Sequence, residues 1–231
     1  MKYLKEKLAQ LIDKSKSSKE LHEKLERGEL EFILVTFVHE GILEYKDYLK
    51  LKKEYEERNK HIDIIRITSP RAFGETWAEE HIREILPELE STKGTEAKGE
   101  YDLVYKNGKK PVKLEVKAGR AIDRTKHHVP YHERALVSTN KKGLFDMNFQ
   151  QMKPTCFDGI IMIGVWTDKI RYWFMTSEEI KKNKYFSVGQ HRGNKGYEGQ
   201  MHIKTENISD FEKYEASPSE IFEKIKKLAA R

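Results

Sequence analysis

The sequence predicts an α/β or α+β domain with a mixed central β-sheet flanked by helices, preceded by a mainly helical N-terminal subdomain. After residue 61 the patterns follow the order strand, helix, hairpin, helix and strands, which is typical of a mixed sheet. Three apolar runs, at residues 32–38, 62–67 and 160–166, supply core material in a chain that is 35% charged. We therefore place the helical subdomain at residues 1–60 and the main domain at residues 61–231.

The N-terminal subdomain is predicted from helical periodicity. Apolar residues recur on one helical face within residues 3–13. Ser17 followed by Glu20 is typical of a capping box at the start of a second helix. Residues 31–38 are apolar and β-branched enough for a strand although their flanks indicate helices, so this segment stays undecided. Residues 40–60 are predicted to be helical.

The main domain is predicted to begin with a short strand at residues 62–68. Ser69 and Pro70 then provide an N-cap and a first-turn proline for a helix. A loop is expected at residues 91–99. Asn107-Gly108 favours a hairpin between the flanking strands, at residues 101–106 and 111–117.

The second half of the main domain alternates between apolar segments and loops. Residues 145–152 are predicted to form a helix that ends at Pro154. Residues 158–166 and 170–175 are predicted to form a strand pair. A glycine-rich loop is expected at residues 190–200, and a closing amphipathic helix at residues 218–230.

Composition narrows the class of protein. The net charge of +6 and the pI near 9.1 suit a polyanionic partner without requiring one. A single cysteine, Cys156, excludes an internal disulfide and a cysteine-rich zinc cluster. No apolar stretch approaches the roughly 20 residues that span a bilayer, and the N-terminus lacks the apolar core of a signal peptide. We expect a soluble, cytoplasmic protein with no membrane association.

The hairpin carries the candidate chemistry. With a two-residue Asn-Gly turn, Asp102 lies opposite Lys113, and with a four-residue loop it lies opposite Glu115. Both registers put Asp102, Glu115 and Lys117 on one face, because side chains alternate along a strand. The carboxylates would then be about 5–8 Å apart. The neighbouring apolar side chains, Leu103, Tyr105, Leu114 and Val116, would point into the core.

Two carboxylates on one sheet face form a hard-oxygen site suited to Mg²⁺, and a lysine on that face can approach an attacking water. The tripeptide Glu-x-Lys is common in this chain, at Glu44, Glu96, Glu115 and Glu179. Only the copy at Glu115 ends an apolar strand that is paired with another strand bearing an aspartate. The alternative is a solvated hairpin face, on which the carboxylates pair with Lys113 and Lys117.

Asp102, twelve intervening residues and Glu115-Val116-Lys117 resemble the signature of the PD-(D/E)XK nucleases, with Tyr101 in place of the usual proline. The preceding acidic helix, and a helix and strand after the hairpin, resemble the core of type II restriction endonucleases over roughly residues 62–176. The resemblance implies a Mg²⁺ ion at Asp102 and Glu115 with the Val116 carbonyl. It also implies a glutamate from the preceding helix, for which Glu75 is preferred over Glu79.

Basic and polar segments are the candidate DNA contacts. Beyond the catalytic strand, five residues are expected to follow a DNA backbone: Arg120, Arg124, Lys126, His127 and His128. In the glycine-rich loop, four side chains are able to contact base edges: Gln190, Arg192, Asn194 and Lys195. The histidines of the first segment, together with His132, could instead bind a metal or act as a general base, and either segment could be a plain solvated surface.

The expected function is therefore a Mg²⁺-dependent, sequence-specific endonuclease of double-stranded DNA that acts as a homodimer, as resemblance to restriction enzymes implies. Two alternatives remain. One is a DNA repair or Holliday-junction-type nuclease on the same fold. The other is a DNA-binding module without catalysis.

Overall fold

The computed structural model describes residues 8–27, 30–96, 99–140, 142–189 and 198–231. The chain divides into two compact units, Met1–Asn59 and Lys60–Arg231. Each unit is described by itself.

The first unit is built from helices in its described part: α2 (Ser18–Arg27), α3 (Leu30–His39) and α4 (Tyr45–Asn59). The segment that the sequence left undecided is the helix α3. Its side chains Ile33, Leu34 and Phe37 are buried in one core with Leu8, Ile12 and Leu21. The spacing of 33, 34 and 37 is helical, so tertiary packing decides against the strand that the β-branched residues favour.

The second unit contains a mixed central sheet with the strand order β1-β2-β3-β5-β6. Its strands are β1 (Glu90–Ser91), β2 (Leu103–Tyr105), β3 (Val112–Arg120), β5 (Gly159–Val165) and β6 (Ile170–Thr176). β3 and β5 run parallel, and the other neighbours are antiparallel. A second sheet has the order β4-β8-β7. It contains β4 (Asp146–Met152), β7 (Phe186–Val188) and β8 (Gly199–Lys204).

The remaining elements are helical. The chain enters this unit through α5 (Ile62–Arg66), the π-helical turn η1 (Ala72–Trp77) and α6 (Ala78–Ile85). Later come α7 (Ser177–Lys181), η2 (Ile208–Tyr214) and α8 (Pro218–Ala229). The predicted start at Ser69 is confirmed in part by a hydrogen bond from the Ala72 amide to its hydroxyl oxygen, 3.3 Å long.

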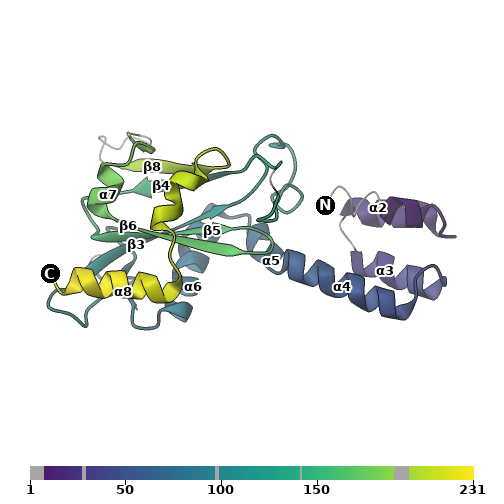
Figure 1. Cartoon of the computed structure of the whole chain (residues 1–231), viewed down its shortest axis with the longest axis horizontal. Helices are drawn as coiled ribbons and strands as arrows, with labels where there is room; N and C mark the ends of the chain where they lie inside the picture. The colour runs from purple at the N-terminus through teal and green to yellow at the C-terminus, as the bar shows by residue number, and fades with distance from the viewer. Residues whose placement is uncertain (1–7, 28–29, 97–98, 141, 190–197) are drawn as a thin grey trace. The chain divides into compact units, whose positions relative to one another are not determined.

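The central sheet is covered on both faces (Figure 1). On one face, α6 and α8 pack through Ile82, Ile221 and Ile225. On the other face lies the second sheet, packed through Met147 of β4 and Ile203 of β8. All seven residues of β5 are buried, as expected for a strand with a core on each side. The predicted mixed sheet flanked by helices is therefore confirmed.

Two predicted elements are wrong. Residues 62–66 form the helix α5 rather than a strand, because helical spacing buries Ile65 among partly buried isoleucines. Residues 146–152 form the strand β4 rather than a helix. The alternation of buried Phe145, Met147 and Phe149 with less buried neighbours has a period of two, which is the period of a strand.

The second error concerns the expected core. The resemblance to restriction endonucleases implied a helix between the hairpin and the next strand of the central sheet. In the described residues between β3 and β5, the chain instead forms loops and β4, which belongs to the second sheet. This part of the architecture departs from the family pattern.

Close packing between the sheets gives a testable expectation at Gly164. A Cβ there would lie 2.7 Å from the ring of Trp173, which is fully buried. We expect Gly164→Ala to destabilise the fold by about 1–3 kcal/mol, the usual effect of overpacking a core. Urea unfolding measures it. Gly74→Ala is the control, since a Cβ there has nothing within 4 Å; equal stability of the two variants would contradict the packing.

Candidate active site

The β2–β3 hairpin brings the predicted catalytic residues together. Leu103 pairs with Leu114, and Val104 pairs with Lys113. One position further, this register sets Asp102 opposite Glu115, as expected for the four-residue loop rather than the two-residue turn. The Asp102 Oδ2 atom accepts a hydrogen bond of 2.8 Å from the Val116 amide. Val116 itself is buried in the core, so Glu115 and Lys117 project from the opposite face.

Glu115 and Lys117 form a buried ion pair. Their Oε1 and Nζ atoms are 2.5 Å apart, and the side chains are 7% and 16% exposed. Lys113, the other candidate partner, is exposed and lies over the ring of Tyr101. The alternative that the sequence left open is met in part, because Glu115 does pair with Lys117, but this pair is buried rather than solvated.

Burial controls the electrostatics of this pair. It raises the pKa of Glu115 to about 7, the negative charge of Asp102 acts in the same direction, and Lys117 opposes both. Burial also disfavours the charged form of Lys117, but Glu115 and Asp102 outweigh it and the pKa of the lysine is raised. Lys117 therefore stays protonated, whereas the charged form of Glu115 is disfavoured by burial and only partly compensated by Lys117.

The preceding helical segment contributes two glutamates. Glu75 lies in η1 with a side chain that is 47% exposed, and its carboxylate is 2.9 Å from Arg71 Nε. Glu79 lies in α6 with a side chain that is 7% exposed, and it pairs with Lys93 at 3.1 Å. Burial raises the pKa of Glu79, and the charges of Asp102 and Glu75 add to this effect. Both carboxylates therefore belong to the electrostatic surroundings of the hairpin site.

The donor atoms fit a hard divalent cation. Asp102 and Glu115 supply carboxylate oxygens, which are the ligands that a hard divalent cation prefers. The Val116 amide faces Asp102, and the carbonyl of the same residue lies on that side of the strand. Among the described residues, however, no group of three or more His, Cys, Asp or Glu side chains is placed to hold a metal ion.

Lys153 is a charged neighbour of the site that the sequence analysis missed. Its Nζ atom donates to the Gly99 carbonyl at 2.9 Å and lies 3.3 Å from the carboxylate of Glu198, which is buried. Its charge lowers the pKa of Glu115. No spacing pattern links Lys153 to Glu115, because it reaches the site from the residue after β4, in the second sheet.

A cleft of about 340 Å³ opens beside Lys117. Its walls come from η1, from the end of β3 and from β4. The residues that line it are Pro70, Arg71, Phe73, Gly74, Glu75, Lys117, Ala118, Arg120, Asn148, Phe149, Gln150 and Gln151. A substrate in this cleft would therefore meet Lys117 and Glu75 on one side and β4 on the other.

The basic residues predicted to contact DNA have different surroundings. The Cζ atom of Arg120 lies 3.5 Å from the centre of the Phe73 ring and 4.6 Å from the centre of the Tyr131 ring. Its guanidinium group also donates a hydrogen bond to the Ile67 carbonyl. Burial lowers its pKa to about 10. These contacts make Arg120 part of the cleft wall.

Arg124 is paired with Glu206. Lys126, His127 and His128 are exposed on the loop after β3, with Lys126 3.8 Å from Asp123. The four predicted base-contacting residues, Gln190, Arg192, Asn194 and Lys195, lie outside the described part of the chain.

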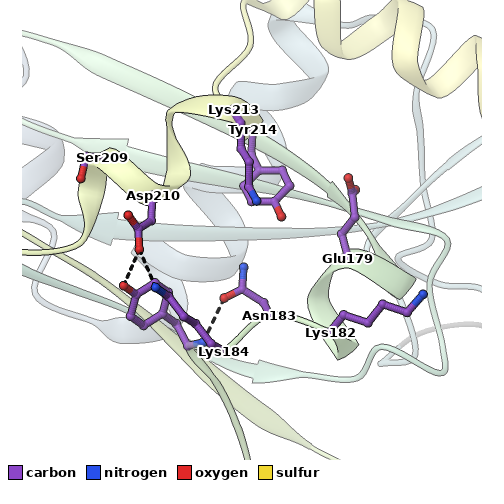
Figure 2. Close-up of a pocket in the computed structure, with 9 residues that line it drawn as sticks. Glu179, Lys182, Asn183, Lys184, Ser209, Asp210, Lys213 and Tyr214 are labelled. Atoms are coloured by element: carbon purple, nitrogen blue, oxygen red, sulfur yellow. Dashed lines mark hydrogen bonds and ion pairs between the residues drawn. The ribbon is translucent and has the colours of Figure 1, made fainter.

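A larger hollow of about 740 Å³ lies elsewhere, between the end of α7 and η2 (Figure 2). There Asp210 accepts a hydrogen bond of 2.6 Å from the Tyr185 hydroxyl and pairs with Lys184 at 2.9 Å. Asp210 is thus compensated by Lys184, and Lys182 and Lys213 line the same hollow. Asp102, Glu115 and Lys117 do not line it.

Comparison of the chain with protein families, with curated proteins and with solved structures finds no match. Among the described residues, no helix has the length and apolar character needed to cross a membrane.

Proposed function

We propose that this chain is a Mg²⁺-dependent endonuclease that hydrolyses double-stranded DNA at specific sequences, in the manner of a type II restriction endonuclease. The observation that carries the proposal is the buried ion pair of Glu115 and Lys117, with Asp102 opposite Glu115 and a cleft beside Lys117. A buried lysine with two carboxylates on a sheet face is costly for a structural role, because removing charges from water has a large penalty. Such clusters concentrate at functional sites.

The residues have distinct roles in this proposal. Asp102 and Glu115 hold the cation, with the Val116 carbonyl as a third oxygen donor, and Glu75 or Glu79 adds a further negative charge. Lys117 stays protonated because its pKa is raised, so its ammonium orients the attacking water and stabilises the negative charge on the phosphate. When bound, Mg²⁺ supplies Lewis-acid stabilisation of the phosphodiester transition state.

The partner is inferred from chemistry and charge. The chain carries a net charge of +6, which favours association with the DNA backbone. Lys126, His127 and His128 are exposed at the loop that follows the catalytic strand. We propose a homodimer on a palindromic site, since a two-fold protein matches a two-fold sequence.

The test is digestion of a sequenced plasmid. With Mg²⁺ we expect cleavage at a fixed sequence, identified by sequencing the ends, and with EDTA we expect none. With Ca²⁺ we expect specific binding without cutting, because Ca²⁺ accepts the same oxygens with longer bonds and looser geometry. Equal cleavage in EDTA would rule out the metal mechanism.

The same digestion separates the alternatives. A repair or junction-resolving nuclease on this site would cut branched or damaged DNA and leave linear duplex intact. A DNA-binding module would bind in every condition and cut in none.

A further inference from the structure

The cleft beside Lys117 has a second wall, formed by β4, that the proposed hydrolysis does not use. β4 pairs with β8 in regular register from Asp146 to Phe149, and the register then shifts before Met152. Gln150 and Gln151 occupy this shift, and both are exposed and line the cleft. We call these two residues the β4 bulge.

The bulge has a strained backbone. Gln151 has a φ of 58°, and it is the one non-glycine residue with positive φ in the described part of the chain. Such a conformation is unfavourable for a residue that has a Cβ atom, and it tends to persist at functional sites. β-Bulges re-aim side chains and are over-represented beside active sites. The conformation of Gln151 therefore points to a use for its side chain.

The bulge is held rigidly beside the catalytic strand. A Cβ at Gly119, two residues after Lys117, would lie 2.8 Å from the Met147 Cβ and 3.0 Å from the Phe149 ring. The glycine therefore allows β4 to pack directly on β3. Met147, Phe149 and Met152 are buried in the core between the sheets, so the exposed glutamines stand on a fixed support.

The side chains of this wall are amides rather than cations. Gln150, Gln151 and Asn148 all line the cleft. The Asn148 Oδ1 atom is buried and has no hydrogen-bond partner, and its Nδ2 atom is 3.4 Å from Gln200 Oε1. An amide offers a donor and an acceptor together, which matches the edge of adenine, whereas a phosphate favours Arg or Lys.

We propose that the β4 bulge recognises base edges of DNA, with a preference for adenine. These bases would lie next to the phosphate that Lys117 contacts in the proposed reaction. The inference rests on the proposed function for its substrate class. It places sequence recognition at Gln150 and Gln151, on a rigid strand beside the catalytic residues.

The test is selection from a random duplex library, by binding in Ca²⁺ and by cutting in Mg²⁺. The variants are Gln150→Ala and Gln151→Gly. Gln151→Gly removes the side-chain amide and introduces glycine, which adopts a positive φ without strain. Gln10→Ala, at an exposed glutamine outside the cleft, is the matched control. Circular dichroism confirms that each variant is folded.

We expect the wild type and Gln10→Ala to select one sequence containing adenine. Each bulge variant should lose preference at one or two positions by roughly 5- to 150-fold, the range that corresponds to one bidentate amide–base contact. An unchanged selected sequence, or equal weakening on all sequences, would overturn the inference, and so would a wild type that selects no sequence. A wild type that selects a sequence in Ca²⁺ but never cuts would refute the hydrolase and leave the recognition site standing.

Discussion

Asp102→Asn, Glu115→Gln and Lys117→Ala should each reduce Mg²⁺-dependent DNA cleavage by at least about 100-fold, the usual scale for a lost acid–base or electrostatic contribution. The first two substitutions replace a carboxylate oxygen, the proposed metal ligand, at nearly constant volume. The third removes the ammonium that lies 2.5 Å from Glu115. Initial rates on supercoiled plasmid measure the effect.

The chain contains its own control for this experiment. Glu44 and Lys46 form another Glu-x-Lys pair, 2.7 Å apart, with side chains that are 71% and 75% exposed. Glu44→Gln and Lys46→Ala should leave cleavage unchanged, because an exposed pair contributes little. If Lys117→Ala cuts at the wild-type rate while it remains folded, the assignment of the active site is lost.

The hairpin and the β5–β6 pair were predicted from the distribution of apolar residues along the strands and from residues that favour turns. Asn107-Gly108 marked the turn, and the buried run of β5 marked a strand with two covered faces. The register stayed open between two alternatives because both satisfy alternation, and tertiary contacts decide it. At residues 62–66 isoleucine content favoured a strand, yet a helical turn buries Ile65, so packing overrode local propensity.

The candidate site was predictable only where its residues share one hairpin. Asp102, Glu115 and Lys117 are linked by strand alternation, which is a local rule. Lys153 and the β4 bulge come from a strand of the second sheet, and their place beside β3 depends on Gly119 allowing close packing. We predicted a helix at residues 145–152, where the structure has the strand β4. A helix would have placed Gln150 and Gln151 differently, so the sequence did not predict this wall of the cleft.

The pH dependence of stability should reveal Glu115 directly. Burial raises its pKa from 4.5 to about 7, so the folded protein binds a proton that the unfolded chain has released. This contribution is full below pH 4.5 and is lost as the pH rises through about 7. The loss is on the order of 3 kcal/mol for such a shift. In EDTA, the free energy of unfolding should therefore fall between pH 5 and pH 8 because of this group.

The comparison with Glu115→Gln measures the loss that comes from the coupled Glu115–Lys117 pair, because Glu115 also raises the pKa of Lys117. His61 and His81 have pKa values that burial lowers, so their contribution rises with pH and opposes Glu115, but it is the same in both proteins. The difference in unfolding free energy between wild type and variant should change with pH in EDTA, in favour of the variant at high pH. Parallel curves would show that Glu115 has an ordinary pKa.

Added Mg²⁺ should remove most of the difference between wild type and Glu115→Gln in how the free energy of unfolding changes with pH. Under the proposed function the ion would require ionised carboxylates and would bind the folded state alone, so its stabilisation should grow as Glu115 loses its proton. We expect the wild type to gain stability from Mg²⁺ at pH 8 and little at pH 5, and Glu115→Gln to gain less at pH 8. Urea unfolding at four pH values, with and without Mg²⁺, measures both effects. An equal gain for both proteins at every pH would place the ion elsewhere.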